Sequence, residues 1–165
     1  GFATTNPATG QVLAQVSQGT LADIDVAVQA ARRAQGKWAK RSGAERARVL
    51  YALARLVQKH ARLFAVLEVM DTGKPIREAR DIDVPLAQRH FYYHAGMAQL
   101  MEETLPGSTA IGVCGQIVPW NFPVMIAIWH IMPAIQAGNT VVLKPSPNTP
   151  LATLRLGQLL QEGSC

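Results

Sequence analysis

Apolar residues recur at three- and four-residue spacing through the first hundred positions, which indicates helices that bury one face. Three ranges show this spacing: 21–38, 42–70 and 76–103. Capping boxes open the first two helices, because Asp23 follows Thr20, and Glu45 follows Ser42, at the interval that the motif requires. We expect the second helix to bend near His60. The third should kink or break at Pro85, whose ring disrupts helical hydrogen bonding.

A different pattern follows, in which two short runs rich in β-branched residues are bounded by glycine and proline. These runs, 112–118 and 140–143, flank the apolar stretch 122–137, which is long enough for a helix to return the chain parallel to the first strand. The order predicts a βαβ unit whose strands are buried on both faces. An apolar helical hairpin is the alternative, which the β-branched runs disfavour. With a strand at 11–16 and a helix at 151–162, the expected fold class is α/β, with helices followed by the start of a parallel sheet.

Two proline-rich turns follow the predicted strands, at the edge where open parallel sheets bind ligands. The first, PWNFP at 119–123, holds Asn121 between two prolines beside a helix N-terminus. A fixed neutral donor there suits an oxygen that gains negative charge during a reaction, but Asn121 could equally be a simple helix cap. The second turn, KPSPNTP at 144–150, places Lys144 where a cation suits a phosphate or a ribose hydroxyl.

Composition narrows the classes of partner. The chain has 165 residues, of which 48% are hydrophobic, so one folded domain with a sizeable core is expected. The net charge is +5, but basic and acidic residues are interleaved between positions 23 and 89, as on solvated helix faces, and we expect no nucleic-acid partner. No stretch reaches about 18 unbroken apolar residues, and no targeting segment is recognisable, so we expect no membrane partner and a cytoplasmic setting.

The cysteines and histidines predict no metal site. Cys114 and Cys165 form neither a disulfide framework nor a metal-ligand spacing, and we expect Cys114 to be a small buried residue of the first central strand. His90 and His94 are four residues apart on a predicted helix, but the acidic residue of an H-E-x-x-H site is missing.

The two turns, in this order and separation, resemble the aldehyde dehydrogenase superfamily. The resemblance rests on GVCGQIVPWNFP at 112–123 and PAIQAGNTVVLKPSPNTP at 133–150. It extends upstream through LEVMDTGKP at 67–75 and NPATG at 6–10, and so covers essentially the whole chain. It implies NAD(P)-dependent oxidation of an aldehyde to a carboxylic acid through a cysteine thiohemiacetal, on a fold with a Rossmann-like parallel sheet.

The resemblance also implies a division of the protein. Residues 1–165 would be the N-terminal portion of the dinucleotide-binding domain. The nucleophilic cysteine, the general-base glutamate and the oligomerisation strands of the family belong to later sequence, and neither Cys114 nor Cys165 corresponds to the nucleophile. We therefore expect this segment alone to be inactive and the complete protein to be a homo-oligomer.

The resemblance assigns roles to residues in and around the two turns. Asn121 corresponds to the asparagine that stabilises the oxyanion. The residues expected along the cofactor are Ile117, Val118, Pro119, Trp120, Lys144, Pro145, Ser146 and Pro147. The residues expected to line the channel of the aldehyde substrate are Phe122, Met125 and Trp129, whose spacing would place them on one helix face.

Two positions depart from the common family pattern. Pro147 stands where many relatives carry a glutamate that binds the ribose hydroxyls, so NAD is expected while NADP remains possible. His130 stands where many members carry a lysine, whose role is therefore not transferred. A non-catalytic, aldehyde-dehydrogenase-like scaffold or assembly module remains the alternative function.

Overall fold

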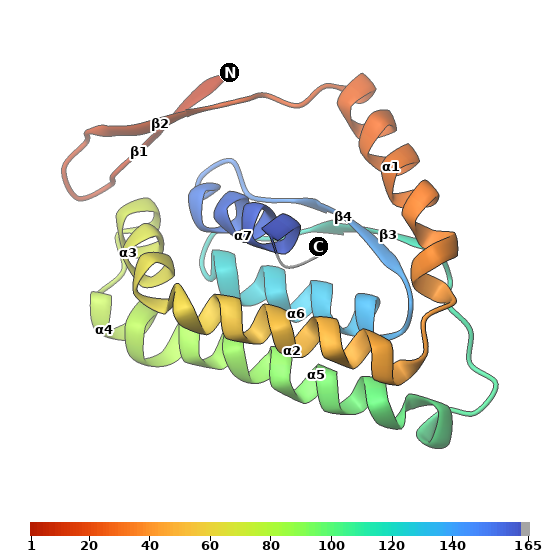
Figure 1. Cartoon of the computed structure of the whole chain (residues 1–165). Helices are drawn as coiled ribbons and strands as arrows, with labels where there is room; N and C mark the ends of the chain where they lie inside the picture. The colour runs from red at the N-terminus through yellow and green to blue at the C-terminus, as the bar shows by residue number, and fades with distance from the viewer. Residues whose placement is uncertain (163–165) are drawn as a thin grey trace.

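The computed structural model describes residues 1–162, and its mixed helix and strand content confirms the α/β class. Figure 1 shows the elements. In chain order they are β1 Phe2–Thr5, β2 Val12–Val16, α1 Leu21–Ala39, α2 Gly43–Lys59, α3 Ala61–Thr72, α4 Ile76–Glu78, a π-helical turn Ala79–Asp83, α5 Val84–Thr104, β3 Val113–Ile117, α6 Pro123–Gln136, β4 Thr140–Lys144 and α7 Leu151–Glu162.

The core lies among α2, α5, α6 and α7. Helices α2 and α5 run antiparallel beside each other, and α6 packs against them (Figure 1). The largest wholly buried apolar side chains include Leu50, Phe64, Phe91 and Ile128, which come from four different helices. At the start of α2, a Cβ on Gly43 would lie 2.1 Å from the carbonyl oxygen of Ala98, so only glycine allows the two backbones to approach this closely.

The predicted βαβ unit is confirmed. Strands β3 and β4 pair in parallel, with the register running from Val113 opposite Thr140 to Ile117 opposite Lys144, and α6 connects them. Helix α6 ends just before Gly138, whose φ of 82° is a left-handed conformation that glycine adopts easily. These strands place the two proline-rich turns side by side at the carboxyl edge of the sheet.

The prediction that both strands are buried on both faces is wrong. Residues 140–143 are only half-buried, and Ile117 keeps 78% of its surface exposed. Cys114, expected to be buried, is also half-buried. Within the described residues the central sheet has two strands, so each strand has one edge without a strand partner.

Helix α1 begins with the predicted capping box, but its apolar face is not buried along its whole length. Leu21 is 82% exposed, whereas Ala31 is buried. The helix lies at one side of the molecule (Figure 1), where its C-terminal half contacts β3 and β4. Trp38 anchors this half, because its indole Nε1 donates a hydrogen bond of 2.9 Å to the carbonyl oxygen of Ile135.

The break expected at Pro85 occurs immediately before it. Instead of one helix from 76 to 103, the chain forms the short helix α4, the π-helical turn Ala79–Asp83, and then α5. Pro85 is the second residue of α5 and has no N–H to donate to the carbonyl four residues earlier, so the hydrogen-bond ladder changes at this point.

The amino-terminal hairpin was only half predicted. Strand β2 was expected, whereas its antiparallel partner β1 was missed. The hairpin is joined to the helical body through Thr4, whose hydroxyl donates a hydrogen bond of 2.9 Å to Asp71 of α3. No helix in residues 1–162 has the length and the apolar content that crossing a membrane requires.

Candidate functional site

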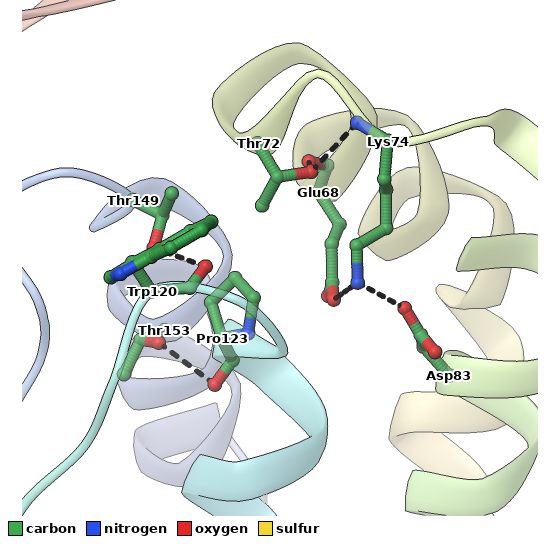
Figure 2. Close-up of polar contacts among 8 residues, drawn as sticks. All are labelled: Glu68, Thr72, Lys74, Asp83, Trp120, Pro123, Thr149 and Thr153. Atoms are coloured by element: carbon green, nitrogen blue, oxygen red, sulfur yellow. Dashed lines mark hydrogen bonds and ion pairs between the residues drawn. The ribbon is translucent and has the colours of Figure 1, made fainter. Parts of the chain in front are cut away.

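The two proline-rich turns form one connected surface at the carboxyl ends of β3 and β4. The backbone N–H of Val118 donates to the carbonyl oxygen of Lys144 over 3.2 Å. The hydroxyl of Thr149, in the second turn, donates to the carbonyl oxygen of Trp120 in the first over 3.1 Å (Figure 2). The side chain of Thr149 is buried, so this link fixes the two turns relative to each other.

Asn121 is exposed at the tip of the first turn. The N-cap of α6 is Phe122, and no side chain caps that helix by a hydrogen bond, so the interpretation of Asn121 as a helix cap is wrong. Within residues 1–162 the amide of Asn121 has no hydrogen-bond partner. The backbone that follows Asn121 is held in place, because the hydroxyl of Thr153 in α7 donates to the carbonyl oxygen of Pro123 over 3.3 Å (Figure 2). The turn therefore presents a free amide from a restrained backbone.

The expected cofactor residues differ in what they expose. The exposed side chains are Ile117, Pro119, Trp120, Lys144 and Pro147, with Pro145 half-buried. Val118 and Ser146 are buried, and the Ser146 hydroxyl accepts a hydrogen bond from the backbone N–H of Asn148. The Lys144 ammonium donates to the carbonyl oxygen of Pro145 over 3.1 Å and otherwise faces solvent. This edge thus offers apolar and aromatic surface with one flexible cation, and the assignment of these residues stays a prediction.

The three expected substrate-channel residues do not share one environment. Phe122 is half-buried and precedes α6, Met125 is buried inside the core, and Trp129 is 48% exposed with its ring 5.1 Å from that of His90. Trp129 is the member of this group that faces open space most clearly. Their role in substrate binding remains a prediction. The neighbouring His130 is exposed.

A buried charge cluster lies beside the first turn, and the sequence interpretation missed it. The ammonium of Lys74 lies 3.2 Å from Oε1 of Glu68 and 2.5 Å from Oδ2 of Asp83, as Figure 2 shows. Glu68 is wholly buried and Asp83 is 1% exposed. The same ammonium lies 4.3 Å from the centroid of the Phe122 ring. A sequence signal existed, because Glu68 follows Phe64 and Ala65 at the spacing of the buried face of α3.

Burial dominates the electrostatics of this cluster. It raises the pKa of Glu68 to about 7, although the charge of Lys74 acts in the opposite direction. Within residues 1–162, Glu68 Oε2 and Asp83 Oδ1 make no hydrogen bond of ordinary geometry, although the backbone N–H of Val124 lies close enough to Glu68 to lower its pKa. The cluster therefore contains two carboxyl groups, one ammonium and two unpaired oxygen atoms.

Asp71 joins three elements near the same end of the molecule. It accepts the hydrogen bond from Thr4 of the hairpin, and its Oδ2 accepts another of 2.8 Å from the backbone N–H of Leu151 at the start of α7. Burial raises the pKa of Asp71 despite these two donors. The position of α7, and with it the restraint on the first turn, thus depends partly on Asp71.

Histidine, cysteine, aspartate and glutamate side chains gather in no group of three or more that could hold a metal ion within the described part of the chain. His90 and His94 stack with their ring centroids 6.2 Å apart, and the pKa of His90 is lowered by burial and by the proximity of His94. Cys114 is a free thiol, while Cys165 lies outside the described residues.

Comparisons with known sequences and structures all point to one family. Residues 1–164 match the sequence model of the aldehyde dehydrogenase family. The fluoroacetaldehyde dehydrogenase of Streptantibioticus cattleyicolor is 44% identical, over 98% of this chain and 34% of that protein. The aminoacetaldehyde dehydrogenase of Pseudomonas aeruginosa is 43% identical, over 98% of this chain and 35% of that protein.

The structural comparison agrees. The NAD+ complex of an aldehyde dehydrogenase from Bacillus cereus superposes with a TM-score of 0.89 at 39% identity, over 99% of this chain and 36% of that one. The chain thus spans about a third of the length of the curated relatives it matches.

Proposed function

This chain belongs to the aldehyde dehydrogenase family, and we propose that the full-length protein that carries it oxidises an aldehyde to a carboxylic acid with NAD. In this proposal, residues 1–165 form the N-terminal portion of the dinucleotide-binding domain. They supply the oxyanion donor and part of the cofactor and substrate walls, whereas the remaining catalytic groups lie elsewhere in the full-length protein.

The observation that carries the proposal is the free amide of Asn121. Asn121 sits at the carboxyl edge of a parallel sheet, in a turn whose neighbouring carbonyl groups are bound by Thr149 and Thr153. Its own side chain has no partner within residues 1–162 and does not cap α6. A polar donor that is held in place but left unpaired is the arrangement that electrostatic catalysis requires.

The amide has a defined task in the proposed chemistry. When a thiolate attacks the aldehyde carbon, the carbonyl oxygen becomes an alkoxide, and the N–H of Asn121 donates to that oxygen. The hydrogen bond is stronger to the alkoxide than to the neutral carbonyl, so it lowers the barrier more than it tightens substrate binding. The thiolate is proposed to come from outside these 165 residues, since Cys114 lies within β3 and not at the turn.

The edge of the sheet fits a dinucleotide. NAD, when bound, would accept the hydride that leaves the former aldehyde carbon. Ile117 and Trp120 offer exposed apolar surface for flat rings, and the exposed Lys144 ammonium can reach a phosphate or a ribose hydroxyl. Pro147 is exposed in the same turn and carries no charge, so it neither binds ribose hydroxyls nor repels a 2′-phosphate. NAD is therefore proposed as the usual cofactor, with NADP less strongly rejected than in relatives that carry a glutamate here.

The proposal is tested with the purified full-length protein and a panel of aldehydes. Fluoroacetaldehyde and aminoacetaldehyde belong in the panel, because two relatives are named for them. We expect aldehyde-dependent formation of NADH and of the matching acid, in proportion to protein concentration. The 165-residue chain alone serves as the control and should form none. A full-length protein that binds neither aldehyde nor NAD would instead support the scaffold function.

The family resemblance also supports a homo-oligomer. Sedimentation of the full-length protein would show a species larger than one chain, and a monomer at assay concentration would contradict this part of the proposal.

A further inference from the structure

The geometry points to Lys74 as a positioning residue for Asn121, held in that role by Glu68 and Asp83. This inference rests on the proposed function, because it assigns Lys74 to the oxyanion donor of that reaction. Lys74 does not approach the reacting atoms itself. It acts through Phe122, the residue that follows Asn121.

Lys74 is held firmly enough to act as a support. Its side chain is 10% exposed, and its ammonium contacts one carboxylate from α3 and another from the π-helical turn. Both carboxylates are almost completely buried, so water competes little for the ammonium. The lysine comes from the short connection between α3 and α4, which the hydroxyl of Thr72 also restrains by accepting from the Lys74 backbone N–H over 3.2 Å (Figure 2).

The Phe122 ring then receives the ammonium at 4.3 Å from its centroid. A cation over an aromatic face is attracted by the ring, and the attraction is stronger when the cation is largely removed from water. Phe122 is also the N-cap of α6, so fixing its ring fixes the backbone at the point where the turn enters the helix. The amide of Asn121 projects from the residue immediately before.

The turn is therefore held from two opposite groups of elements. Thr149, in the turn that leads into α7, donates to the carbonyl oxygen of Trp120, and Thr153 of α7 donates to the carbonyl oxygen of Pro123. The connection between α3 and α4 holds Phe122 through Lys74. Asn121 lies between these supports, and its side chain makes no hydrogen bond within residues 1–162.

Stability alone is a weak reason for such a cluster. Buried ion pairs often contribute little net stability, because removing the charges from water costs about as much as their attraction returns. Here the balance is poorer still, since two carboxyl groups face one ammonium and each retains an unpaired oxygen. Preorganisation of the turn gives the cluster a second role, because a displacement of about 1 Å in a catalytic group can cost roughly 10²-fold in rate.

The test compares variants of the full-length protein in single-turnover kinetics. Lys74→Met keeps an unbranched side chain, shorter only by the terminal nitrogen, and removes the cation. The triple variant Glu68→Gln/Lys74→Met/Asp83→Asn does the same without leaving buried charges unpaired, so it remains informative if the single variant folds poorly. The matched control is Arg80→Met, which removes a cation from the ion pair with Asp81, where Arg80 is 60% exposed.

Both Lys74 variants should slow the chemical step by about 10- to 10²-fold while the KM for NAD stays within about twofold. The control should leave both values unchanged. The deciding measurement repeats the Lys74 substitutions in an Asn121→Ala background. If Lys74 acts through Asn121, the Lys74 substitutions should lower the single-turnover rate of the Asn121→Ala protein little further. An equal fall in the single-turnover rate with and without Asn121 would overturn the inference. So would Lys74 variants that have a lower Tm and a normal chemical step.

A second readout separates this inference from the proposed function. Amide hydrogen exchange at Ile126, whose backbone N–H donates to the carbonyl oxygen of Phe122, should accelerate in both Lys74 variants and not in Arg80→Met. If Asn121→Ala leaves the reaction unchanged, the oxyanion role is wrong, and the exchange result still decides whether Lys74 holds the turn. Unchanged exchange in the triple variant would refute the positioning role whatever the kinetics show.

Discussion

Replacing Asn121 by alanine in the full-length protein should separate catalysis from stability. The side chain is exposed, has no hydrogen-bond partner within residues 1–162 and caps no helix. Its removal should therefore change the free energy of unfolding by no more than about 0.5 kcal/mol. A side-chain cap would instead have contributed about 1 kcal/mol.

The kinetic effect should be much larger. Loss of one preorganised oxyanion donor lowers the rate by roughly 10²- to 10³-fold, which corresponds to about 3 to 4 kcal/mol of transition-state stabilisation. We expect this loss in the single-turnover rate of acid formation, while the affinity for NAD changes little. Single-turnover measurements are needed because product release can hide the chemical step in steady-state kcat.

Asn148→Ala is the matched control. Asn148 is also an exposed asparagine in a proline-rich turn, and its backbone N–H, rather than its side chain, donates a hydrogen bond to the hydroxyl of Ser146. This variant should retain the single-turnover rate within about twofold. A normal chemical step in Asn121→Ala, or an equal loss in Asn148→Ala, would refute the reasoning that the free amide of Asn121 is the oxyanion donor.

Three further substitutions test the surroundings of the site. Burial raises the pKa of Glu68 from 4.5 to about 7, so the folded protein retains a proton that the unfolded chain releases between these values. Stability should therefore decline as the pH rises through that window, by at most about 3 kcal/mol. Thermal unfolding against pH should show this decline reduced in Glu68→Gln, and equal slopes would contradict it. Asp71→Ala leaves the Thr4 hydroxyl and the Leu151 N–H without their acceptor and should cost roughly 2 to 4 kcal/mol in denaturant unfolding; a loss below about 1 kcal/mol would count against this estimate. Pro147→Glu should lower kcat/KM for NADP relative to NAD by about tenfold or more, because a carboxylate repels the 2′-phosphate, and unchanged discrimination would rule out this placement of Pro147.

Local sequence was sufficient for much of the architecture. The capping boxes at Thr20 and Ser42 and the turn around Asn121 depend on residues within a few positions of one another, and each element of the βαβ order is indicated by its own short run of residues. Their hydrogen bonds and backbone preferences are settled at short range, so the pattern predicts them directly. The two proline-rich turns were also specific enough to indicate the aldehyde dehydrogenase family, which the match over residues 1–164 confirms.

Periodicity did not predict which surfaces would be covered. The spacing of Leu21 and its neighbours indicates an apolar helix face, yet Leu21 is 82% exposed because the C-terminal half of α1 makes the contacts with the sheet. The strands likewise have apolar sequences but remain half-buried. A hydrophobic pattern records the preference of a side chain for burial, and only tertiary packing decides whether another element covers it.

The supports of the site were decided by tertiary structure alone. The sequence determined that a lysine follows Gly73, that a glutamate lies on the apolar face of α3 and that Phe122 follows Asn121. Only the fold brings the Lys74 ammonium to Glu68, Asp83 and the Phe122 ring, and Thr149 to the carbonyl of Trp120. The contacts of Lys74 with Phe122 and of Thr149 with Trp120 join residues far apart in the chain. The energy of all four contacts depends on burial and distance, neither of which exists until the helices have packed.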